Sequence, residues 1–336
     1  MEVNLQVTLA QRPNGFPRES DFRLVEAPVP VPGEGEALVK IVYLSLDPYM
    51  RALMNEAPGY LPAAGIGGVM FGGAVGKIMQ SSHPDLRKGD IVEGMFGWQK
   101  YAVTDGRGLR RINPDVAPIS TALGVLGMPG LTAYFGLLEI GRPQPGEIVL
   151  VSGGAGAVGS VVGQIAKLKG CRVIGIAGSD LKINHMVRDY GYDAAFNYRS
   201  VENYYAVLRE MCPEGIDVYF DNVGGAITDA ALRLLRQRAR VVVCGQISQY
   251  NLQEREVGPR SLPLLLRHQA RAEGFLVSQF ADLYPQGLAQ LTDWLREGKL
   301  KYREDIVEGI ENAPTAFIAM LQGRNLGKQL VKLAVP

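Results

Sequence analysis

The stretch that decides the fold is Val149-Leu150-Val151-Ser152-Gly153-Gly154-Ala155-Gly156-Ala157-Val158-Gly159, and residues 160–167 follow it with helical spacing. An apolar run, a glycine-rich turn and a helical pattern together predict a strand, a tight turn and a helix N-terminus. Here we expect Gly154 to turn sharply, Gly156 to let the backbone approach a pyrophosphate, and Gly159 to let the helix pack on its strand. The positive end of the helix dipole would face the anion. The stretch therefore predicts a dinucleotide-binding site.

The composition is that of an ordinary globular protein. The chain has 336 residues, a length that suits two domains, and its 35 Lys and Arg against 34 Asp and Glu give a net charge of +1. This balance gives no electrostatic reason to expect nucleic acid or an anionic membrane as a partner. No apolar run approaches the ~20 residues that span a bilayer, and the N-terminus lacks the form of a signal peptide. Three widely spaced cysteines argue against a disulfide framework, so we expect a cytoplasmic location.

The pattern of apolar residues changes twice along the chain. Residues 1–123 indicate short strands separated by Pro and Gly turns, and residues 298–336 return to this character. Between them, residues 124–297 alternate helical segments with β-branched strands at 148–151, 172–176, 217–220, 240–244 and 271–278. Alternating strands and helices predict parallel βαβ units. We therefore expect an α/β protein in which a Rossmann doubly wound parallel sheet is inserted in a β-rich domain, with the active site in the cleft between the two lobes.

The end of the second Rossmann strand indicates the cofactor. An acidic side chain at this point binds the ribose hydroxyls of NAD and repels the 2′-phosphate of NADP. Here the tip is Gly178-Ser179, which is small and uncharged, and Lys182 offers a cation, although an alternative is that it is a solvated surface lysine. Asp180 lies near the spacing of the NAD acid, but we expect it to cap the following helix. The sequence favours NADP.

Metal and hydrolase chemistry lack the residues they need. His83, His185 and His268 are not paired at ligand spacing with a cysteine or another histidine, and no clustered cysteines suggest a structural zinc. No G-x-S-x-G elbow suggests a serine hydrolase. We therefore predict no metal and favour a hydride transfer that needs only hydrogen-bond donors.

An ordered set of motifs resembles one family over the whole chain. The motifs are Leu44 to Arg51, Gly127 to Tyr134, Gly154 to Gly159, Phe196-Asn197-Tyr198, Tyr219 to Gly225, Cys244 to Asn251 and Asn325 to Lys328. Together they resemble the zinc-free medium-chain dehydrogenases/reductases, specifically the group of prostaglandin reductase, leukotriene 12-hydroxydehydrogenase and plant alkenal double-bond reductases. The resemblance implies a GroES-like catalytic domain around the Rossmann domain. Arg324 is a departure, because some relatives have an acid there.

The resemblance also implies which residues form the site. The cofactor residues would be Gly156, Ala157, Val158, Gly159, Lys182, Tyr198, Asn222, Cys244, Gly245, Gln246, Ile247, Ser248, Tyr250, Phe275, Leu276, Val277 and Asn325. The substrate pocket would include Tyr49, Met128 and Tyr250. From the residues alone we expect Tyr134 to be a packing residue. We expect Asp47 to be a turn or backbone hydrogen-bonding residue rather than a catalytic acid. Asp221 and Asn222 could simply end a strand, although for Asn222 we favour contact with a ligand.

We predict an NADPH-dependent reductase of carbon–carbon double bonds conjugated to a carbonyl, acting on small-molecule enones and enals. Hydride would go to the β-carbon, and Tyr250, a phenol with a reference pKa of ~10, would donate to the developing enolate. The proton for the α-carbon could come from Tyr250 or water. One alternative is an NADPH quinone oxidoreductase, and another is a non-catalytic NADPH-binding protein. We also expect a homodimer, because a strand at 271–278 would leave an open sheet edge that pairs with its counterpart in relatives.

Overall fold

The computed structural model describes residues 2–56, 63–254 and 256–335. The chain divides into two compact units: unit 1 is Met1–Gly124 with Glu304–Pro336, and unit 2 is Val125–Arg303. The first boundary falls one residue after the predicted one, whereas the second falls at Arg303 rather than 297. Residues 297–303 belong to unit 2 because Leu300 is buried and because Gln164 holds Lys301 by two hydrogen bonds, Nε2 to the Lys301 carbonyl at 2.8 Å and the Lys301 N–H to Oε1 at 2.7 Å.

Unit 2 is built on a six-stranded parallel sheet. Its strands lie in the order β10-β9-β8-β11-β12-β13. Their bounds are β8 Ile148–Ser152, β9 Arg172–Ala177, β10 Ala194–Asn197, β11 Ile216–Asp221, β12 Leu235–Val243 and β13 Arg271–Gly274. The order is that of a doubly wound Rossmann sheet, so the predicted fold class is confirmed.

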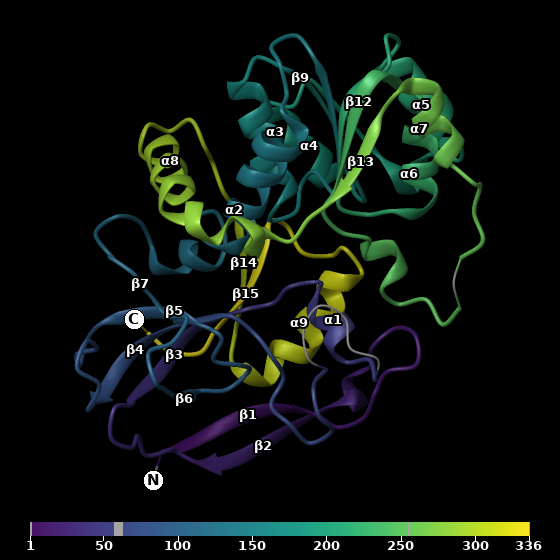
Figure 1. Ribbon diagram of the computed structural model, residues 1–336. Helices are drawn as coiled ribbons and strands as arrows, with labels where there is room; N and C mark the ends of the chain where they lie inside the picture. The colour runs from purple at the N-terminus through teal and green to yellow at the C-terminus, as the bar shows by residue number, and fades with distance from the viewer. Residues whose placement is uncertain (1, 57–62, 255, 336) are drawn as a thin grey trace. The chain divides into compact units, whose positions relative to one another are not determined.

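Helices cover both faces of this sheet (Figure 1). One face carries α2 (Met128–Phe135), α3 (Gly159–Leu168) and α4 (Asp180–Arg188). The other carries α5 (Tyr204–Met211), α6 (Gly225–Leu232) and α7 (Leu262–His268), whose apolar side chains pack on Leu150, Ile174 and Tyr219. The π-helix η3 (Gly136–Gly141) continues α2, and α8 (Tyr284–Arg296) packs beside it.

The sequence did not predict β10, and two predicted strands of unit 2 differ in length from the structure. β12 begins at Leu235, five residues before the predicted 240, because Leu235 already pairs with Ile216 of β11. A bulge then interrupts the pairing until Arg240. β13 ends at Gly274, not at 278, because Val277–Leu283 turn into the 3₁₀ helix η6. The β13 prediction was therefore too long by four residues.

Unit 1 is the β-rich part. Its main sheet has the order β14-β15-β3-β4-β5-β7, with β6 also paired to β3, and β1 and β2 form a separate hairpin. The strands are β1 Val3–Leu9, β2 Phe22–Pro28, β3 Ala37–Ser45, β4 Ala74–Ser81, β5 Ile91–Gly94, β6 Tyr101–Thr104, β7 Arg110–Arg111, β14 Glu304–Glu308 and β15 Lys328–Lys332. Two helices accompany them, α1 (Met50–Leu53) and α9 (Ala313–Leu321).

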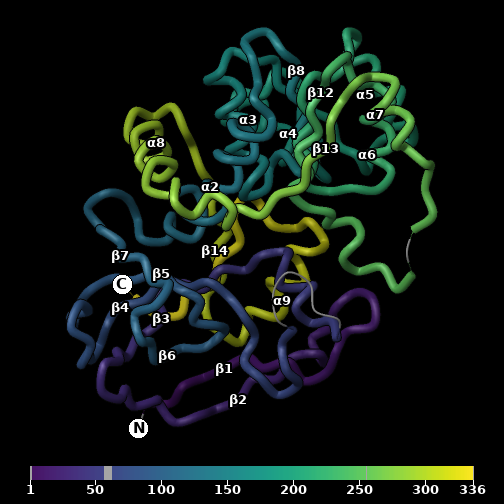
Figure 2. The backbone as a smooth tube through the Cα atoms, viewed as in Figure 1, coloured from purple at the N-terminus to yellow at the C-terminus, as the bar shows by residue number. Residues whose placement is uncertain are grey.

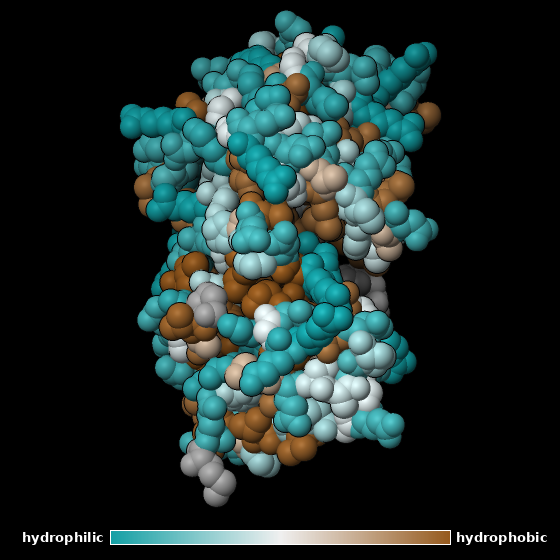
Figure 3. Space-filling model, turned by 90° about the vertical axis from the view of Figure 1, so that its left-hand side faces the viewer, coloured by the Kyte–Doolittle hydropathy of each residue, from teal (hydrophilic) through white to brown (hydrophobic). Residues whose placement is uncertain are grey.

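The C-terminal residues complete the sheet of unit 1. β15 pairs antiparallel with β3, Leu330 opposite Ser45, so the last strand lies beside one from the first part of the chain (Figure 2). On the face drawn in Figure 3, hydrophilic side chains predominate and hydrophobic ones reach the surface between them. No helix in the described part of the chain is long and apolar enough to cross a membrane.

Candidate active site

The glycine-rich turn between β8 and α3 has the predicted strand–turn–helix form. The sharp turn is made by Gly153, whose φ of 62° lies in the left-handed region, and not by Gly154 as predicted. The Gly156 N–H closes the turn by donating to the Gly153 carbonyl at 3.0 Å. A side chain at Gly159 would meet that same carbonyl at 2.3 Å, so the helix can begin this close to the strand only with glycine. The N–H groups of the first turn of α3 are thus held at the end of β8.

A buried tyrosine outside the glycine motif supports this turn. Tyr192 donates its hydroxyl proton to the Gly159 carbonyl at 2.7 Å and lies 3.3 Å from that of Gly154. Side chains at Gly163 and Gly175 would lie within 2.1 Å and 2.8 Å of its ring. Burial raises the pKa of Tyr192, so its hydroxyl stays protonated. Several glycines are therefore explained by the space that Tyr192 occupies, a role that the motif alone did not reveal.

The tip of β9 differs from prediction in its helix cap. Ser179, not Asp180, is the N-cap of α4, and its Oγ accepts the Lys182 N–H at 3.4 Å. Asp180 instead accepts a hydrogen bond from Asn197 Nδ2 at 3.0 Å. Tyr198 lies against the tip, because a side chain at Gly178 would come within 2.9 Å of its ring. The half-buried Lys182, in the first turn of α4, and the half-buried Tyr198, directly after β10, thus follow the carboxyl ends of two neighbouring strands, β9 and β10.

Asp221, at the carboxyl end of β11, is the centre of a buried hydrogen-bond network. The side chain is completely buried. Its two oxygens accept six hydrogen bonds with lengths between 2.7 and 3.1 Å. The donors to Oδ1 are the hydroxyls of Ser152 and Tyr219 and the N–H groups of Val223 and Gly224. The donors to Oδ2 are Thr228 Oγ1 and Gln246 Nε2. Asp221 is therefore more than the end of a strand. It holds the segments that follow β8, β11 and β12 in one place.

Asn222 is positioned from β8. Its Nδ2 donates to the Ser152 carbonyl at 2.8 Å, and its N–H donates to Ser152 Oγ at 2.9 Å. The next segment is bound in turn to this one, because the Cys244 and Gly245 N–H groups both donate to the Asp221 carbonyl at 2.9 and 3.0 Å. The Ser248 N–H likewise donates to the Val223 carbonyl. The structure therefore brings together the predicted residues 222 and 244–250 at the carboxyl ends of β11 and β12.

Tyr250 closes the 244–250 segment as a protonated donor. The Gln246 N–H donates to Tyr250 Oη at 3.2 Å, a contact that leaves the phenolic hydrogen for another acceptor. The ring is half-buried, and desolvation is the main reason that the pKa of Tyr250 is raised above its ordinary value. At neutral pH the residue therefore keeps its proton and can donate it.

Cys244, in the same segment, also has a raised pKa. Desolvation raises the pKa of its thiol to about 12, so the thiol keeps its proton at neutral pH. Cys171 and Cys212 are buried, and their thiols are free like that of Cys244. Across residues 2–56, 63–254 and 256–335, no three His, Cys, Asp or Glu side chains are grouped so that they could hold a metal ion.

The predicted residues after β13 and at the start of α2 differ in burial. The Phe275 ring is buried between Gly136 and Phe280, so its side chain belongs to the core of unit 2, whereas Leu276 is exposed. Met128 is exposed at the start of α2. Tyr134 packs edge-on against Phe135 with ring centroids 5.1 Å apart, and its predicted packing role is confirmed.

Unit 1 holds the two remaining predicted residues, Tyr49 and Asn325. Both are half-buried, Tyr49 just before α1 and Asn325 just before β15. A buried ion pair joins their segments: Lys328 Nζ lies 2.5 Å from Asp47 Oδ1 and donates to the Leu46 carbonyl at 2.8 Å. Asp47 also accepts a hydrogen bond from Ser45 Oγ. Asp47 begins the turn before α1, as expected, because its carbonyl accepts the Met50 N–H at 3.1 Å, but the main partner of its carboxylate is the side chain of the distant Lys328.

Sequence reasoning missed Ser152, Tyr192, Asp221 and Lys328 as residues that organise these segments. For Ser152 and Asp221 a signal existed, because each is a polar residue that ends an otherwise apolar strand of a parallel sheet. Tyr192 and Lys328 gave no such signal, since their partners are far away along the chain.

Comparison with known proteins identifies the family of this chain. Residues 5–112 match the model of the N-terminal domain of oxidoreductases, and residues 157–294 match that of the zinc-binding dehydrogenases. The chain is 48% identical over 333 residues to YfmJ of Bacillus subtilis (strain 168), named as an NADP-dependent oxidoreductase, and the alignment covers 98% of each chain. The chain belongs to the zinc-free medium-chain dehydrogenases/reductases. The predicted family is confirmed, and the residues that the structure describes offer no group of ligands for the zinc ion in the name of the second model.

Other relatives in this family have names that state a reaction. The NADPH-dependent curcumin reductase of Escherichia coli (strain K12) is 45% identical, covering 98% of this chain and 97% of the relative. The NADP-dependent 2-alkenal reductase of Nicotiana tabacum is 43% identical, covering 98% of each. Among solved structures, CurA of Vibrio vulnificus in complex with NADPH superposes with a TM-score of 0.95 at 43% identity, covering 99% of this chain and all of that one.

Proposed function

We propose that this protein reduces the carbon–carbon double bond of α,β-unsaturated ketones and aldehydes with NADPH. The observation that carries the proposal is the joined pair of segments after β11 and β12, which presents Asn222 and a protonated Tyr250 in the unit that holds the glycine turn. The names of the relatives support it, because a 2-alkenal is an aldehyde with a conjugated double bond and the curcumin and alkenal reductases use NADPH or NADP.

The residues of unit 2 fit a dinucleotide. The turn at Gly153–Gly156 and the first turn of α3 offer backbone donors for the pyrophosphate, so we assign Gly156 to Gly159 this role. At the tip of β9, Lys182 and Tyr198 would contact the 2′-phosphate, while Asp180 is already bound to Asn197. Cys244 to Ser248 and Asn222 would hold the nicotinamide, and Asn325 and residues 275–277 stay predictions for the rest of the cofactor.

When bound, the reduced nicotinamide supplies a hydride to the β-carbon of the substrate. Negative charge then develops on the carbonyl oxygen, and a donor that already points at this oxygen lowers the barrier. We assign this role to Tyr250, whose Oη accepts from Gln246 and keeps its own hydrogen. The α-carbon finally takes up a proton, from Tyr250 or from water. Tyr49 and Met128 stay predictions for the substrate pocket.

A substrate panel tests the proposal. Purified protein is mixed with NADPH and with enals, enones, 15-keto prostaglandins or quinones, and NADPH oxidation is followed by absorbance. We expect turnover of conjugated carbonyl compounds and a saturated carbonyl product by mass spectrometry. Turnover of quinones alone would favour the quinone oxidoreductase, and NADPH binding without any turnover would favour a non-catalytic protein.

The preference for NADPH should depend on Lys182. A lysine–phosphate contact is a charge-assisted hydrogen bond of ~1.5–3 kcal/mol, so Lys182→Ala should raise the KM for NADPH roughly ten- to a hundredfold. The KM for NADH should barely change, because NADH has no 2′-phosphate. Arg188→Ala, at an exposed position of the same helix, is the matched control and should leave both KM values unchanged. Equal damage with both cofactors would assign Lys182 to the pyrophosphate or to structure.

We also assign the protein to the cytoplasm as a homodimer. Three free thiols support a reducing compartment. β13 is the last strand of its sheet and all four of its residues are exposed, so its edge is open for pairing with a second copy. Analytical ultracentrifugation at micromolar concentration should give a dimer, and a monomer at that concentration would contradict the assignment.

A further inference from the structure

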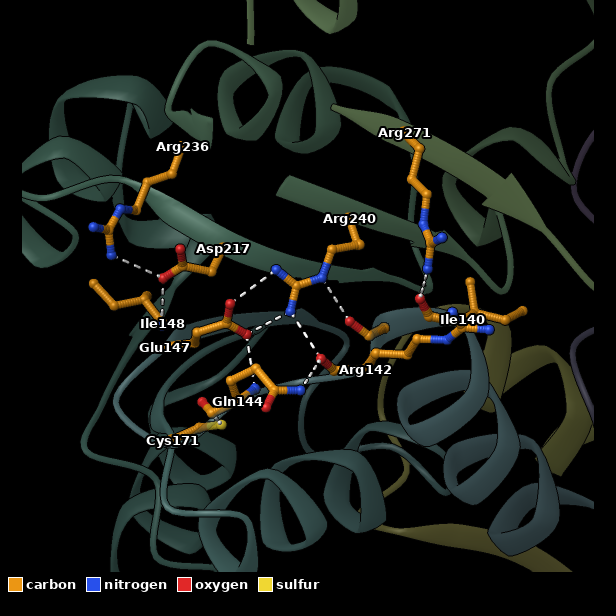
Figure 4. A network of polar contacts seen from close by, with 11 residues as sticks. Ile140, Arg142, Gln144, Glu147, Ile148, Cys171, Asp217, Arg236, Arg240 and Arg271 are labelled. Carbon is orange, nitrogen blue, oxygen red and sulfur yellow. Dashed lines mark hydrogen bonds and ion pairs between the residues drawn. The ribbon is translucent and has the colours of Figure 1, made fainter. Parts of the chain in front are cut away.

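A cavity lined by arginines lies in unit 2, away from the segments described above. Its volume is about 330 Å³, and its lining residues are Arg142, Arg238, Ala239, Arg240, Gln269 and Arg271. Arg240 and Arg271 are partners in the pairing of β12 with β13, at the start of β13, whereas the 244–250 segment follows the other end of β12. Figure 4 shows the polar network around Arg142, Arg240 and Arg271.

Among the described residues, only one of these arginines has a carboxylate partner that neutralises its charge. Arg240 pairs with Glu147 through both terminal nitrogens, in a two-pronged contact. Arg142, Arg238 and Arg271 have no carboxylate within ion-pair distance in the part of the chain that the structure describes. Three positive charges therefore share one cavity. All three are exposed, so solvent screens their mutual repulsion, but their positive charges together favour an anion in the cavity.

Capping of η3 explains part of this cluster. Arg142 Nε donates to the Glu139 carbonyl at 2.7 Å, and Arg271 donates to the Ile140 carbonyl at 2.6 Å. These contacts satisfy carbonyls at the C-terminal end of the helix. A guanidinium has five N–H donors, however, and each of these two uses one of them in this way. Arg238 caps nothing, so capping does not explain its place in the cavity.

The backbone gives a second, independent observation. Among the described residues, three that are not glycine have a positive φ: Arg142 at 45°, Arg238 at 63° and Gln269 at 48°. All three line this cavity. Arg238 lies in the bulge of β12, and Arg142 and Gln269 follow the C-terminal ends of η3 and α7. A left-handed residue is a common way to end a helix, so the helix ends account for Arg142 and Gln269. Arg238 has no helix end to account for its backbone, which is unfavourable for arginine, so its place in the cavity is held at a cost.

We propose that this cavity binds a diphosphate group, free or carried by a nucleotide, independently of the cofactor. The planar guanidinium matches phosphate oxygens with two parallel hydrogen bonds, and three arginines without carboxylate partners suit a group with several negative charges. The volume is at the lower end of that of small-molecule sites, enough for a diphosphate with part of its substituent.

Isothermal titration calorimetry of the full-length protein tests this assignment. Saturating NADP⁺ is present throughout, so that the phosphate sites of the cofactor are filled, and the ionic strength is constant. Inorganic pyrophosphate and ADP are the two probes. We expect saturable binding, and Arg142→Gln and Arg238→Gln should each raise the Kd about tenfold, as the loss of one charge-assisted contact does. Tighter binding of ADP would indicate a nucleotide, and tighter binding of pyrophosphate the free anion.

Two further variants separate a site from general charge. Arg238→Gly removes the guanidinium but suits the left-handed backbone, so it should weaken pyrophosphate binding while the melting temperature without pyrophosphate stays the same or rises. Arg209→Gln removes an exposed positive charge of α5 that does not line the cavity, and it should leave the Kd unchanged. Absence of binding by the unmodified protein, or the same Kd for the cavity variants, would overturn the proposal. Equal weakening by Arg209→Gln would do so too.

Discussion

Tyr250→Phe is expected to lower the turnover number about a hundredfold while the affinity for NADPH stays nearly constant. The variant loses one hydroxyl and keeps the ring. If Tyr250 donates to the developing enolate, its loss affects mainly the transition state, and one preorganised donor is worth on the order of ~3 kcal/mol. A hydroxyl of the cofactor ribose offers a second donor, so a loss nearer tenfold still agrees with the role. Steady-state kinetics with the best enone of the panel give the turnover number, and fluorescence titration gives the Kd of NADPH.

The turnover numbers of Tyr250→Phe and the unmodified enzyme can be compared in this way only if hydride transfer limits the rate. NADPH deuterated at the transferred position should slow the unmodified enzyme if hydride transfer limits the rate. Tyr134→Phe is the matched control, because Tyr134 is a packing residue of the same unit, and its turnover should be unchanged. Unchanged turnover of Tyr250→Phe, alongside a clear deuterium effect, would make Tyr250 a packing residue as well. The pKa of Tyr250 is raised above its ordinary value of ~10, so its hydroxyl stays protonated up to at least that pH. Below a pH of about 10, we therefore expect no fall in turnover from deprotonation of Tyr250.

Asp221→Asn is expected to destabilise the protein by about 3 kcal/mol and to lower turnover as well. The carboxylate accepts six hydrogen bonds in a completely buried place, and the amide of asparagine offers one acceptor oxygen and adds two donors. Buried donors that lose their acceptor cost ~1–3 kcal/mol each, and part of this loss is recovered by rearrangement. Calorimetry should show a melting temperature lower by roughly 5–10 °C. Turnover should fall because Gln246, which binds Tyr250, loses its anchor.

A second aspartate of the same strand provides the control. Asp217 is buried near the start of β11, where it accepts the Ile148 N–H at 2.9 Å and pairs with Arg236. Asp217→Asn should therefore lower the melting temperature but leave the kinetic constants of the folded enzyme unchanged. If Asp221→Asn reduced stability only, like Asp217→Asn, then Asp221 would not position the Tyr250 segment.

The sequence predicted the glycine turn because this motif is local. The apolar run, the glycines and the helical pattern lie within residues 149–167, and each acts through neighbours in the chain. Even here, local reasoning did not predict which glycine makes the turn and which glycines make space for a side chain. Gly153 makes the turn, and Gly163 and Gly175 make space for Tyr192, whose ring comes from a segment near β10.

The cap of α4 and the length of β13 were wrong for a related reason. Ser179 and Asp180 are both good N-caps, and which of them begins the helix depended on Asn197, a residue of the neighbouring strand that binds Asp180. Residues 275–277 have strand-like character, yet Phe275 turns into the core beside Gly136 and ends the strand. In both places a contact between distant residues outweighed local preference.

By itself the sequence determined the family and the alternation of strands and helices in unit 2, because periodicity, glycine motifs and an end-to-end series of motifs are written along the chain. It did not predict β10 or the last residue of each strand. Only the tertiary structure decided what those residues do together. Asp221 accepts hydrogen bonds from donors at the ends of three strands, Lys328 pairs with Asp47 across 281 positions of the chain, and four arginines line one cavity. Hydrogen bonds and charges act over a few ångströms in space whatever their separation in sequence, so their partners are fixed only when the strands are paired.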